Sequence, residues 1–321
     1  MMPIAADNVF LDRASAYQWS ELNETVFLER FFRCLAQCMG ERFQEYTYYV
    51  LSSHHPDVIP QSAAFAGPRK VLFFISDESS SIPTALHSKY FAIFKCYLPS
   101  EVPGTNIFSF TLGYVRGVPE CVMKPAEERT YDVFFSGSLH SGRLAFYREM
   151  HPVLKRLPPK IANRILIRLI SGSGRRFLNN DPGIVFPRSY IRFTDAFKAG
   201  LTPESYGMLL SDSKIVLCPK GARSAETFRH MEAIRAGAVA VSESLPNTHF
   251  YRGSPIVQVP DWRSGFRVVR RIVADPDLLG SLQSKTIAWW RDVCSESATA
   301  HYVSRTLLQH EGTSRNPQHF R

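Results

Sequence analysis

The amino-acid sequence predicts an α/β protein built from two Rossmann-like domains. Short apolar runs, each long enough for one buried parallel strand, alternate along the chain with segments of helical periodicity. The 321 residues suffice for two domains, because one domain usually takes about 100–200 residues. Hydrophobic residues make up 45% of the chain and charged residues 21%, which is typical of a globular protein rather than a disordered one.

The first half of the chain begins with a predicted helix. Residues 25–40 carry apolar side chains at helical spacing, and Gly40 is expected to end this helix. Aromatic and aliphatic runs suited to buried strands follow at 46–51, 70–76, 91–98 and 107–112. The clearest of them, KVLFFIS at 70–76, brings Asp77 and Glu78 to its carboxyl end, where ligands of open α/β sheets bind.

A polar stretch that reaches Glu128 separates the two halves, and we place a domain boundary near residue 125. The expected parts are an acceptor-side domain over 1–125, a donor-binding domain over 126–300, and a helix end with a mobile tail over 301–321. Strands of the second half are expected at 131–135, 190–193, 214–217, 239–241 and 255–260. Helices are expected up to about residue 155 and over 203–210, 262–274 and 276–297, with a last piece through 308.

The alternation of strand and helix is clearest in residues 213–241. The apolar strand there runs into the turn Cys218-Pro219-Lys220-Gly221, after which apolar residues recur every three positions. Ser224 is the expected N-cap of this helix, and Gly237 is expected to end it. Because free backbone N–H groups at a helix N-terminus attract phosphate, this βαβ unit predicts a phosphate site.

These residues resemble the donor-binding half of exostosin-like glycosyltransferases. That family reads as a C-P-[RK]-G turn, then R-x-x-E-A-I-x-A-G, a β-strand and a proline. The matching segments here are CPKG at 218–221, RHMEAIRAG at 229–237, and AVAV followed by SLP; YDVFFSGS at 131–138 and VPDW at 259–262 fit the same order. The resemblance covers Thr130–Trp262 and implies a GT-B architecture, with two Rossmann-like halves facing across a cleft and the nucleotide-sugar held mostly by the C-terminal half.

The resemblance implies a soluble, bacterial-type glycosyltransferase that serves surface polysaccharide synthesis. It would pass a sugar from a nucleotide-sugar, with a UDP-sugar favoured, to a hydroxyl of a glycan or lipid-linked glycan. Many retaining GT-B enzymes carry a glutamate eight residues before the acid that binds the ribose. Here Ser224 stands eight residues before Glu232, which favours inversion of the anomeric configuration. The alternatives are a fucosyltransferase-like enzyme that uses a GDP-sugar and a catalytically silent relative that binds glycan or nucleotide.

The expected donor site needs positive charge for the diphosphate and a carboxylate for the ribose. A guanidinium such as that of Arg143 can hold phosphate oxygens with two N–H groups, whereas Lys220 would act as a point charge. Glu232 is expected to accept hydrogen bonds from the ribose hydroxyls, or else to pair with an arginine of its own helix. The expected donor-binding residues are Gly137, Arg143, Lys220, Gly221, Ser224, Thr227, Arg229 and Glu232. For the basic ones the alternative is a solvated surface charge.

Inversion requires a base for the acceptor hydroxyl, and the resemblance places that base in the first half. Asp77 and Glu78 are the catalytic candidates, although Asp77 can instead cap a turn. His54 and His55, after the strand at 46–51, are the alternative. Further candidates for contact with the substrates are the serines at 79–81, His87, Lys89 and Lys95. Trp262 is expected to pack in the core rather than against a substrate.

No metal ion or other cofactor is expected. The D-x-D triplet that holds a divalent ion in the other major glycosyltransferase architecture occurs once, as Asp275-Pro276-Asp277, and there it is typical of a helix start. Cys34 and Cys38 could join a histidine around zinc, but free cysteines are commonly buried as small hydrophobic residues. Six cysteines without regular spacing do not describe a disulfide scaffold.

The net charge of +9 predicts an anionic partner. Because the basic residues are scattered and no nucleic-acid motif accompanies them, no nucleic-acid partner is expected. The basic amphipathic segment Ala162–Arg176 either rests on an anionic membrane or packs as an ordinary helix. The sequence shows no signal peptide and no apolar stretch of about 18 residues. We therefore expect a cytoplasmic protein, peripheral at the inner face of the membrane if that segment binds lipid.

Overall fold

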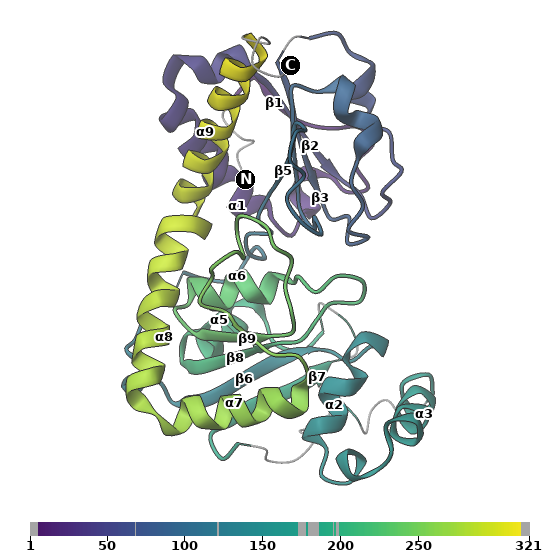
Figure 1. The fold of residues 1–321 in the computed structure, drawn as a ribbon, viewed down its shortest axis with the longest axis vertical. Coiled ribbons are helices and arrows are strands. Elements are labelled where there is room, and N and C mark those ends of the chain that lie inside the picture. The colour runs from purple at the N-terminus through teal and green to yellow at the C-terminus, as the bar shows by residue number, and fades with distance from the viewer. Residues whose placement is uncertain are drawn as a thin grey trace. The chain divides into compact units, whose positions relative to one another are not determined.

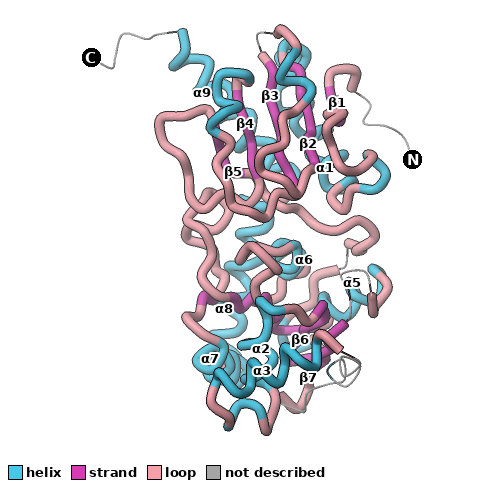
Figure 2. The backbone as a smooth tube through the Cα atoms, turned by 90° about the vertical axis from the view of Figure 1, so that its right-hand side faces the viewer, coloured by secondary structure: helices cyan, strands magenta, loops and turns pink. Residues whose placement is uncertain are grey.

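The structure is a computed structural model that describes residues 6–67, 69–120, 122–172, 178, 186–194, 196 and 199–315. The chain divides into two compact units, and each can be followed in Figures 1 and 2. Unit 1 comprises Met1–Arg116, Pro246–Arg252 and Arg291–Arg321, and unit 2 comprises Gly117–Leu245 and Gly253–Trp290. Residue 125, the expected boundary, belongs to unit 2, and the chain returns to unit 1 after it has passed through unit 2.

Unit 1 contains a five-stranded sheet in the order β1-β2-β3-β4-β5, in which every neighbouring pair is parallel. The strands are β1 (Val9–Leu11), β2 (Thr47–Ser52), β3 (Lys70–Ile75), β4 (Ala92–Lys95) and β5 (Ile107–Ser109). β3 is buried at each of its positions. Its uninterrupted apolar run is therefore that of a central strand covered on both faces.

Two long helices pack against each other in unit 1, α1 (Thr25–Met39) and α9 (Glu296–Arg315) (Figure 1). Three phenylalanines of α1 form an aromatic layer with the sheet; the rings of Phe31 and Phe32 lie 5.4 and 5.2 Å from that of Phe73. The opposite face of β3 contributes Leu72 and Phe74 to a second cluster. Short 3₁₀ helices complete this unit: η1 (Trp19–Glu21), η2 (Gly40–Glu45), η3 (Gln61–Ala64) and η4 (Thr84–Lys89).

The sheet of unit 2 is also parallel, in the order β10-β9-β8-β6-β7. Its strands are β6 (Tyr131–Ser138), β7 (Ser189–Thr194), β8 (Ser213–Cys218), β9 (Val239–Ser242) and β10 (Val257–Gln258). Counted from β6, this is the doubly wound order 2-1-3-4-5. The chain leaves β7 on one side of β6 and continues at β8 on the other. Such a switch point opens a crevice at the carboxyl ends of the two strands, β6 and β8, where open α/β sheets bind their ligands.

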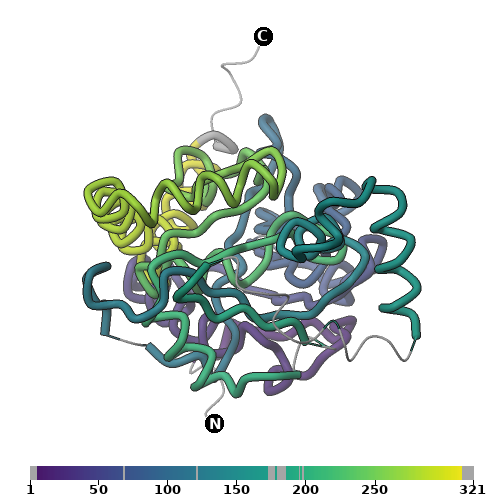
Figure 3. Tube along the Cα trace, turned by 90° about the horizontal axis from the view of Figure 1, so that it is seen from below, coloured from purple at the N-terminus to yellow at the C-terminus, as the bar shows by residue number. Residues whose placement is uncertain are grey.

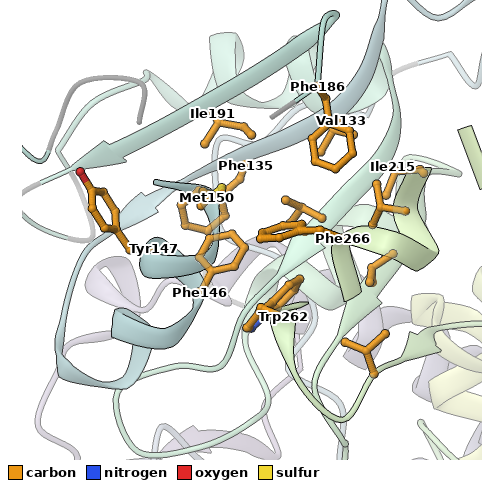
Figure 4. Close-up of a cluster of buried hydrophobic side chains, with 14 of the residues drawn as sticks. Val133, Phe135, Phe146, Tyr147, Met150, Phe186, Ile191, Ile215, Trp262 and Phe266 are labelled. Carbon is orange, nitrogen blue, oxygen red and sulfur yellow. The ribbon is translucent and has the colours of Figure 1, made fainter. Parts of the chain in front are cut away.

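The helices of unit 2 lie on both faces of its sheet (Figure 1). They are α2 (Leu144–Met150), α3 (Pro159–Ile170), α5 (Pro203–Ser211), α6 (Phe228–Arg235), α7 (Trp262–Ala274) and α8 (Pro276–Trp289), with short turns η5 (Ala126–Glu128), η6 (Ser141–Arg143) and η7 (Leu154–Arg156). A π-helical turn, Trp290–Cys294, precedes α9. The odd-numbered residues of the central strands, such as Val133 and Phe135, face a cluster built with α2 and α7 (Figure 4).

The predicted fold class, an α/β protein with two Rossmann-like domains, is confirmed by the two parallel sheets. α7 coincides with the predicted helix over 262–274. Trp262 is buried with its ring 4.5 Å from that of Phe146, as expected of a core residue. Asp275 accepts a hydrogen bond from the Leu278 N–H and so begins α8, as the helix-start interpretation predicted. In the described part of the chain, no helix combines the length and the apolar character that crossing a membrane requires.

Candidate functional site

Two loops meet at the switch point of unit 2. One follows β6 and leads into η6, and the other follows β8 and leads into α6. The loops touch at glycines: a Cβ atom on Gly142 would lie only 2.9 Å from the carbonyl oxygen of Gly221. The side chain of Arg143 joins the same two loops, because its Nε donates to the Lys220 carbonyl at 3.0 Å and its Nη1 to the Ser138 carbonyl at 2.7 Å.

A second arginine, Arg229 from the first turn of α6, points to the same place. Its Nη2 donates to the Ser136 carbonyl at 2.6 Å, so both guanidinium groups bind to the end of β6. Arg143 and Arg229 are only 6% and 8% exposed. Both guanidinium carbons lie over the ring of Phe135, at 5.8 and 4.8 Å from its centroid, and the aromatic face offsets part of their charge.

The positive charge of this pair is incompletely compensated. Burial, followed by the charge of Arg229, lowers the pKa of Arg143 to about 9. In the described residues, the Nε and Nη1 of Arg229 are buried and have no hydrogen-bond partner. A buried N–H group without a partner costs about 1–3 kcal/mol, and more when the group is charged. An anion that accepted these hydrogen bonds would remove the cost, so the switch point has the chemistry of an anion site.

Gly137 allows the two guanidinium groups to come together. A Cβ atom there would lie 2.4 Å from Nη2 of Arg229 and 3.2 Å from Nη1 of Arg143. We therefore expect Gly137→Ala to displace both groups and to weaken the binding of a nucleoside diphosphate by about tenfold or more, measured by calorimetry. Gly280→Ala in α8 is the matched control, because nothing lies within 4 Å of its Cβ position. It should leave binding unchanged, and equal losses in both variants would contradict the role of Gly137.

His140 belongs to this site, although the sequence analysis did not include it. Burial, together with the charges of Arg143, Arg229 and Lys220, lowers the pKa of His140 to about 4, so the imidazole is neutral near pH 7. Its Nδ1 accepts a hydrogen bond from the Gly142 N–H at 3.2 Å. The ring proton is therefore on Nε2, which can donate to an anion. The sequence signal was a histidine between the end of a predicted strand with its Ser-Gly-Ser sequence and an arginine.

The turn after β8 holds the other predicted phosphate ligands. The backbone N–H of Lys220 donates to the Glu243 carboxylate at 2.9 Å, and the side chain of Lys220 is exposed. Gly221 N–H donates to the Ser224 carbonyl at 2.8 Å, which closes the turn. The Ser224 hydroxyl accepts from Glu226 N–H at 3.2 Å. Either role predicted for Lys220, as a phosphate ligand or as a surface charge, is compatible with this position.

The predicted start of α6 was wrong. Ser224 is not the N-cap, because α6 begins four residues later, at Phe228, with Thr227 as its N-cap. A capping box with His230 sets this start: Nδ1 of His230 lies 3.1 Å from both the backbone nitrogen and Oγ1 of Thr227. The other ring nitrogen lies 2.7 Å from the Ser242 hydroxyl. Burial lowers the pKa of His230 to about 3, so this fully buried ring is neutral. The end of the helix was predicted correctly, since Gly237 has a φ of +64°.

Glu232 faces a tyrosine. Its Oε2 accepts a hydrogen bond from the Tyr206 hydroxyl at 2.9 Å, and the residue is 4% exposed. Burial, followed by the charge of Glu232, raises the pKa of Tyr206 well above its ordinary value, so this hydroxyl keeps its proton and donates it. The ribose role of Glu232 stays a prediction, and any ribose hydroxyl that binds there must share the carboxylate with Tyr206.

Asp77, the first catalytic candidate of unit 1, is enclosed. It has no exposed surface, and its Oδ2 lies 3.0 Å from Nζ of Lys95, which is equally buried. Its oxygens also accept hydrogen bonds from the hydroxyls of Ser79 and Ser81 at 2.5 and 2.7 Å. Burial alone would raise the pKa of Asp77, but the bonds from Ser79 and the charge of Lys95 outweigh it and lower the pKa. A carboxylate held in this way is a poor proton acceptor, and the turn-capping alternative describes it better. Lys95, expected to contact substrate, instead lies inside the unit as its partner.

The other candidates of unit 1 are more accessible. Glu78 is partly exposed, and His55, His87 and Lys89 are exposed. His54 is exposed as well, but its ring is held: Nδ1 lies 3.0 Å from the Ser76 carbonyl and Nε2 lies 2.9 Å from the Tyr17 hydroxyl. Because a carbonyl can only accept, Nδ1 carries the proton, and Nε2 is the basic nitrogen. In this geometry Nε2 accepts the hydrogen bond of the Tyr17 hydroxyl, and the role of His54 as a base stays a prediction.

The cysteines considered as zinc ligands lie on α1. Sγ of Cys38 is 3.6 Å from both ring nitrogens of His301 on α9. Burial raises the pKa of Cys34 and of Cys38, which favours the thiol over the thiolate that binds metal. Within the described ranges, no three or more residues of the types His, Cys, Asp and Glu are grouped so that they could hold a metal ion.

Comparison with known proteins gave similarity in structure only. No protein-family model and no curated protein matches the chain. Among solved structures, it is similar to a UDP-forming α,α-trehalose-phosphate synthase from Burkholderia xenovorans in complex with glucose-6-phosphate, at 11% identity and a TM-score of 0.49, over 92% of this chain and 81% of that one. It is also similar to S. aureus TarM in complex with UDP, at 12% identity and a TM-score of 0.47, over 85% of this chain and 58% of that one. A third similar structure is that of Acinetobacter baumannii MurG, at 13% identity and a TM-score of 0.43, over 88% of this chain and 80% of that one. Similarities at this level do not distinguish one activity from another.

Proposed function

We propose that this protein is an inverting, metal-independent glycosyltransferase of the exostosin-like type. It takes a sugar from a nucleotide-sugar, with a UDP-sugar favoured, and transfers it to a hydroxyl of a glycan or lipid-linked glycan of the cell surface. One observation carries the proposal. At the switch point of unit 2, two buried arginines converge, and two guanidinium nitrogens of Arg229 have no hydrogen-bond partner in the part of the chain that the structure describes. Arg229 and Lys220, which the family resemblance placed in one donor site, both contribute to this point.

The chemistry needed is stabilisation of a leaving diphosphate. In an inverting transfer, the acceptor oxygen forms a bond to the anomeric carbon while the bond from that carbon to the diphosphate breaks. The acceptor proton goes to a base, and the bonding electrons leave with the diphosphate, whose negative charge increases. Arg229 and Arg143 are fixed before the reaction and meet this charge without reorganisation. His140 adds a neutral N–H donor from Nε2.

For the base we propose His54, since Asp77 is enclosed. His54→Gln should lower the transfer rate by about 100-fold or more and leave UDP affinity unchanged, because general-base catalysis contributes about 10²–10⁴-fold. His55→Gln, the same change at the neighbouring exposed position, is the matched control. If Glu78→Gln rather than His54→Gln abolishes transfer, Glu78 is the base.

Asp77→Asn should lower the free energy of unfolding by about 3–5 kcal/mol, because the charge of Lys95 would stay buried without the carboxylate that pairs with it.

The function is tested by thermal unfolding of the full chain with UDP, GDP and CMP, followed by transfer assays with their sugars. A ligand at about 100 times its dissociation constant adds about 2.7 kcal/mol, which raises the unfolding temperature measurably. We expect one nucleotide to stabilise the protein and its sugar to be transferred with inversion, in EDTA as in buffer. Retention of the anomeric configuration, or loss of transfer in EDTA that manganese restores, would contradict the mechanism. Nucleotide binding without transfer of any sugar would favour the catalytically silent alternative.

A further inference from the structure

The outer surface of helix α3 combines basic and large apolar side chains. Lys160, Arg164 and Arg168 follow one another at a spacing of four and are all exposed. At 100° per residue they form one stripe along the helix. Ile161 and Ile165 lie on one side of this stripe and Ile167 on the other, and these isoleucines are 52%, 38% and 51% exposed. We call these six residues the α3 face.

The α3 face is not needed to hold the helix on unit 2. Ala162 and Leu166, on the opposite side of α3, are buried in the hydrophobic cluster, and Leu169 and Ile170 pack against it. α3 lies at the edge of unit 2, beside α2 (Figures 1 and 3). Packing therefore explains the inner side of α3 but leaves its outer isoleucines without a role in the fold.

The charge around the α3 face has one sign. The sequence from His151 to Gly172 contains no Asp or Glu. Just before α3, the turn η7 adds exposed Lys155 and Arg156, and Val153 beside it is 60% exposed. A surface for a soluble acidic protein would not require isoleucines on both sides of its basic stripe, whereas an anionic bilayer offers phosphates to the lysines and arginines and acyl chains to the isoleucines.

We propose that the α3 face docks unit 2 on an anionic lipid bilayer. The isoleucines enter the boundary between headgroups and acyl chains, and the basic stripe binds lipid phosphates, so that α3 lies parallel to the membrane plane. This extends the expectation drawn from Ala162–Arg176; the last four residues of that segment, 173–176, lie outside the described residues, and the argument does not use them. The proposal is independent of the proposed enzyme activity.

The test is cosedimentation of the full chain with vesicles of phosphatidylcholine alone and with vesicles that also contain phosphatidylglycerol. We expect binding only to the anionic vesicles and release at high salt, because screening weakens the phosphate contacts. Arg164→Glu/Arg168→Glu should lower partitioning by about tenfold or more. Ile161→Ser/Ile165→Ser should also lower partitioning severalfold, although it changes no charge.

The matched control reverses the same charges elsewhere on unit 2. Arg267 and Arg271 are exposed on α7 at the same spacing of four. Arg267→Glu/Arg271→Glu should bind the anionic vesicles like the unchanged protein. Equal losses in both arginine pairs would show attraction by net charge alone and would overturn the α3 face as a dock. No binding of the unchanged chain to anionic vesicles, or binding that neither α3 variant weakens, would also overturn it. Retained circular dichroism and nucleotide-induced stabilisation show that the variants are folded.

Discussion

Replacing Arg229 by methionine is expected to weaken the binding of UDP, or of whichever nucleotide the protein takes, by at least about 100-fold. A buried, hydrogen-bonded charge contributes about 2–5 kcal/mol to a complex, and every 1.4 kcal/mol is a factor of ten. Stability without ligand should change by less than about 1 kcal/mol. The lost hydrogen bond to Ser136 is offset because one of two adjacent buried charges disappears. Calorimetric titration and denaturant unfolding give the two quantities.

Arg235→Met is the matched control for this change. Arg235 lies on the same helix and is 8% exposed like Arg229, but its Nη1 donates to the Val118 carbonyl at 3.1 Å, away from the end of β6. Its loss should lower the free energy of unfolding by about 1–3 kcal/mol and leave the nucleotide affinity within about twofold. If Arg229→Met bound nucleotide as well as the unchanged protein does, the switch point would not be the phosphate site.

A marked loss of stability in mild acid is the second large effect we expect, and His230 contributes to it together with His140. In the folded protein, burial holds the pKa of His230 near 3, whereas in the unfolded chain it is about 6.5. Between these values the unfolded state binds a proton that the folded state does not. Stability is therefore complete above about pH 6.5 and declines as the pH falls towards 3. At about pH 5 the loss amounts to about 2 kcal/mol for this one group.

His230→Asn isolates this contribution. Asparagine does not titrate, so the fall in the free energy of unfolding between about pH 7.5 and about pH 5 should be smaller by about 2 kcal/mol than in the unchanged protein. At neutral pH the variant should be less stable by about 1–2 kcal/mol, because the capping box with Thr227 is weakened. An unaltered pH dependence in His230→Asn would mean that the buried ring accepts a proton in the folded state.

The fold was predicted from local patterns in the sequence, namely apolar runs and apolar residues at helical spacing. Strand β3 was predicted because the five residues 71–75 that follow Lys70 form one apolar run, and α7 because its apolar side chains recur at helical spacing between Asp261 and Asp275. β1 was missed, since three residues with one exposed phenylalanine give no such run. The start of α6 was misplaced because Ser224 is a good N-cap by type, whereas the real cap depends on His230 and its tertiary partner Ser242.

The candidate sites depended on contacts that spacing alone does not encode. Arg143 and Arg229 are 86 positions apart, and only the parallel pairing of β6 with β8 brings their loops to one edge of the sheet. The enclosure of Asp77 depends on Lys95, which follows one strand later. A strand-end carboxylate that binds a ligand and one that neutralises a buried lysine look alike in sequence. Motif and strand position therefore located the region of the candidate anion site, but not which side chains of unit 1 are accessible.

The return of the chain to unit 1 bears on the order in which the two units are completed during synthesis. Val303 and Leu307 of α9 are completely buried in unit 1, and Glu311 accepts a hydrogen bond from Arg69 at 2.7 Å. A ribosome releases these residues only after all of 117–290 has been made. Unit 2, whose segments are complete by then, can fold as the chain emerges, whereas α1 can pack against α9 only after α9 has been made. Residues 6–116 are thus translated before unit 2, but the unit to which they belong is completed after it.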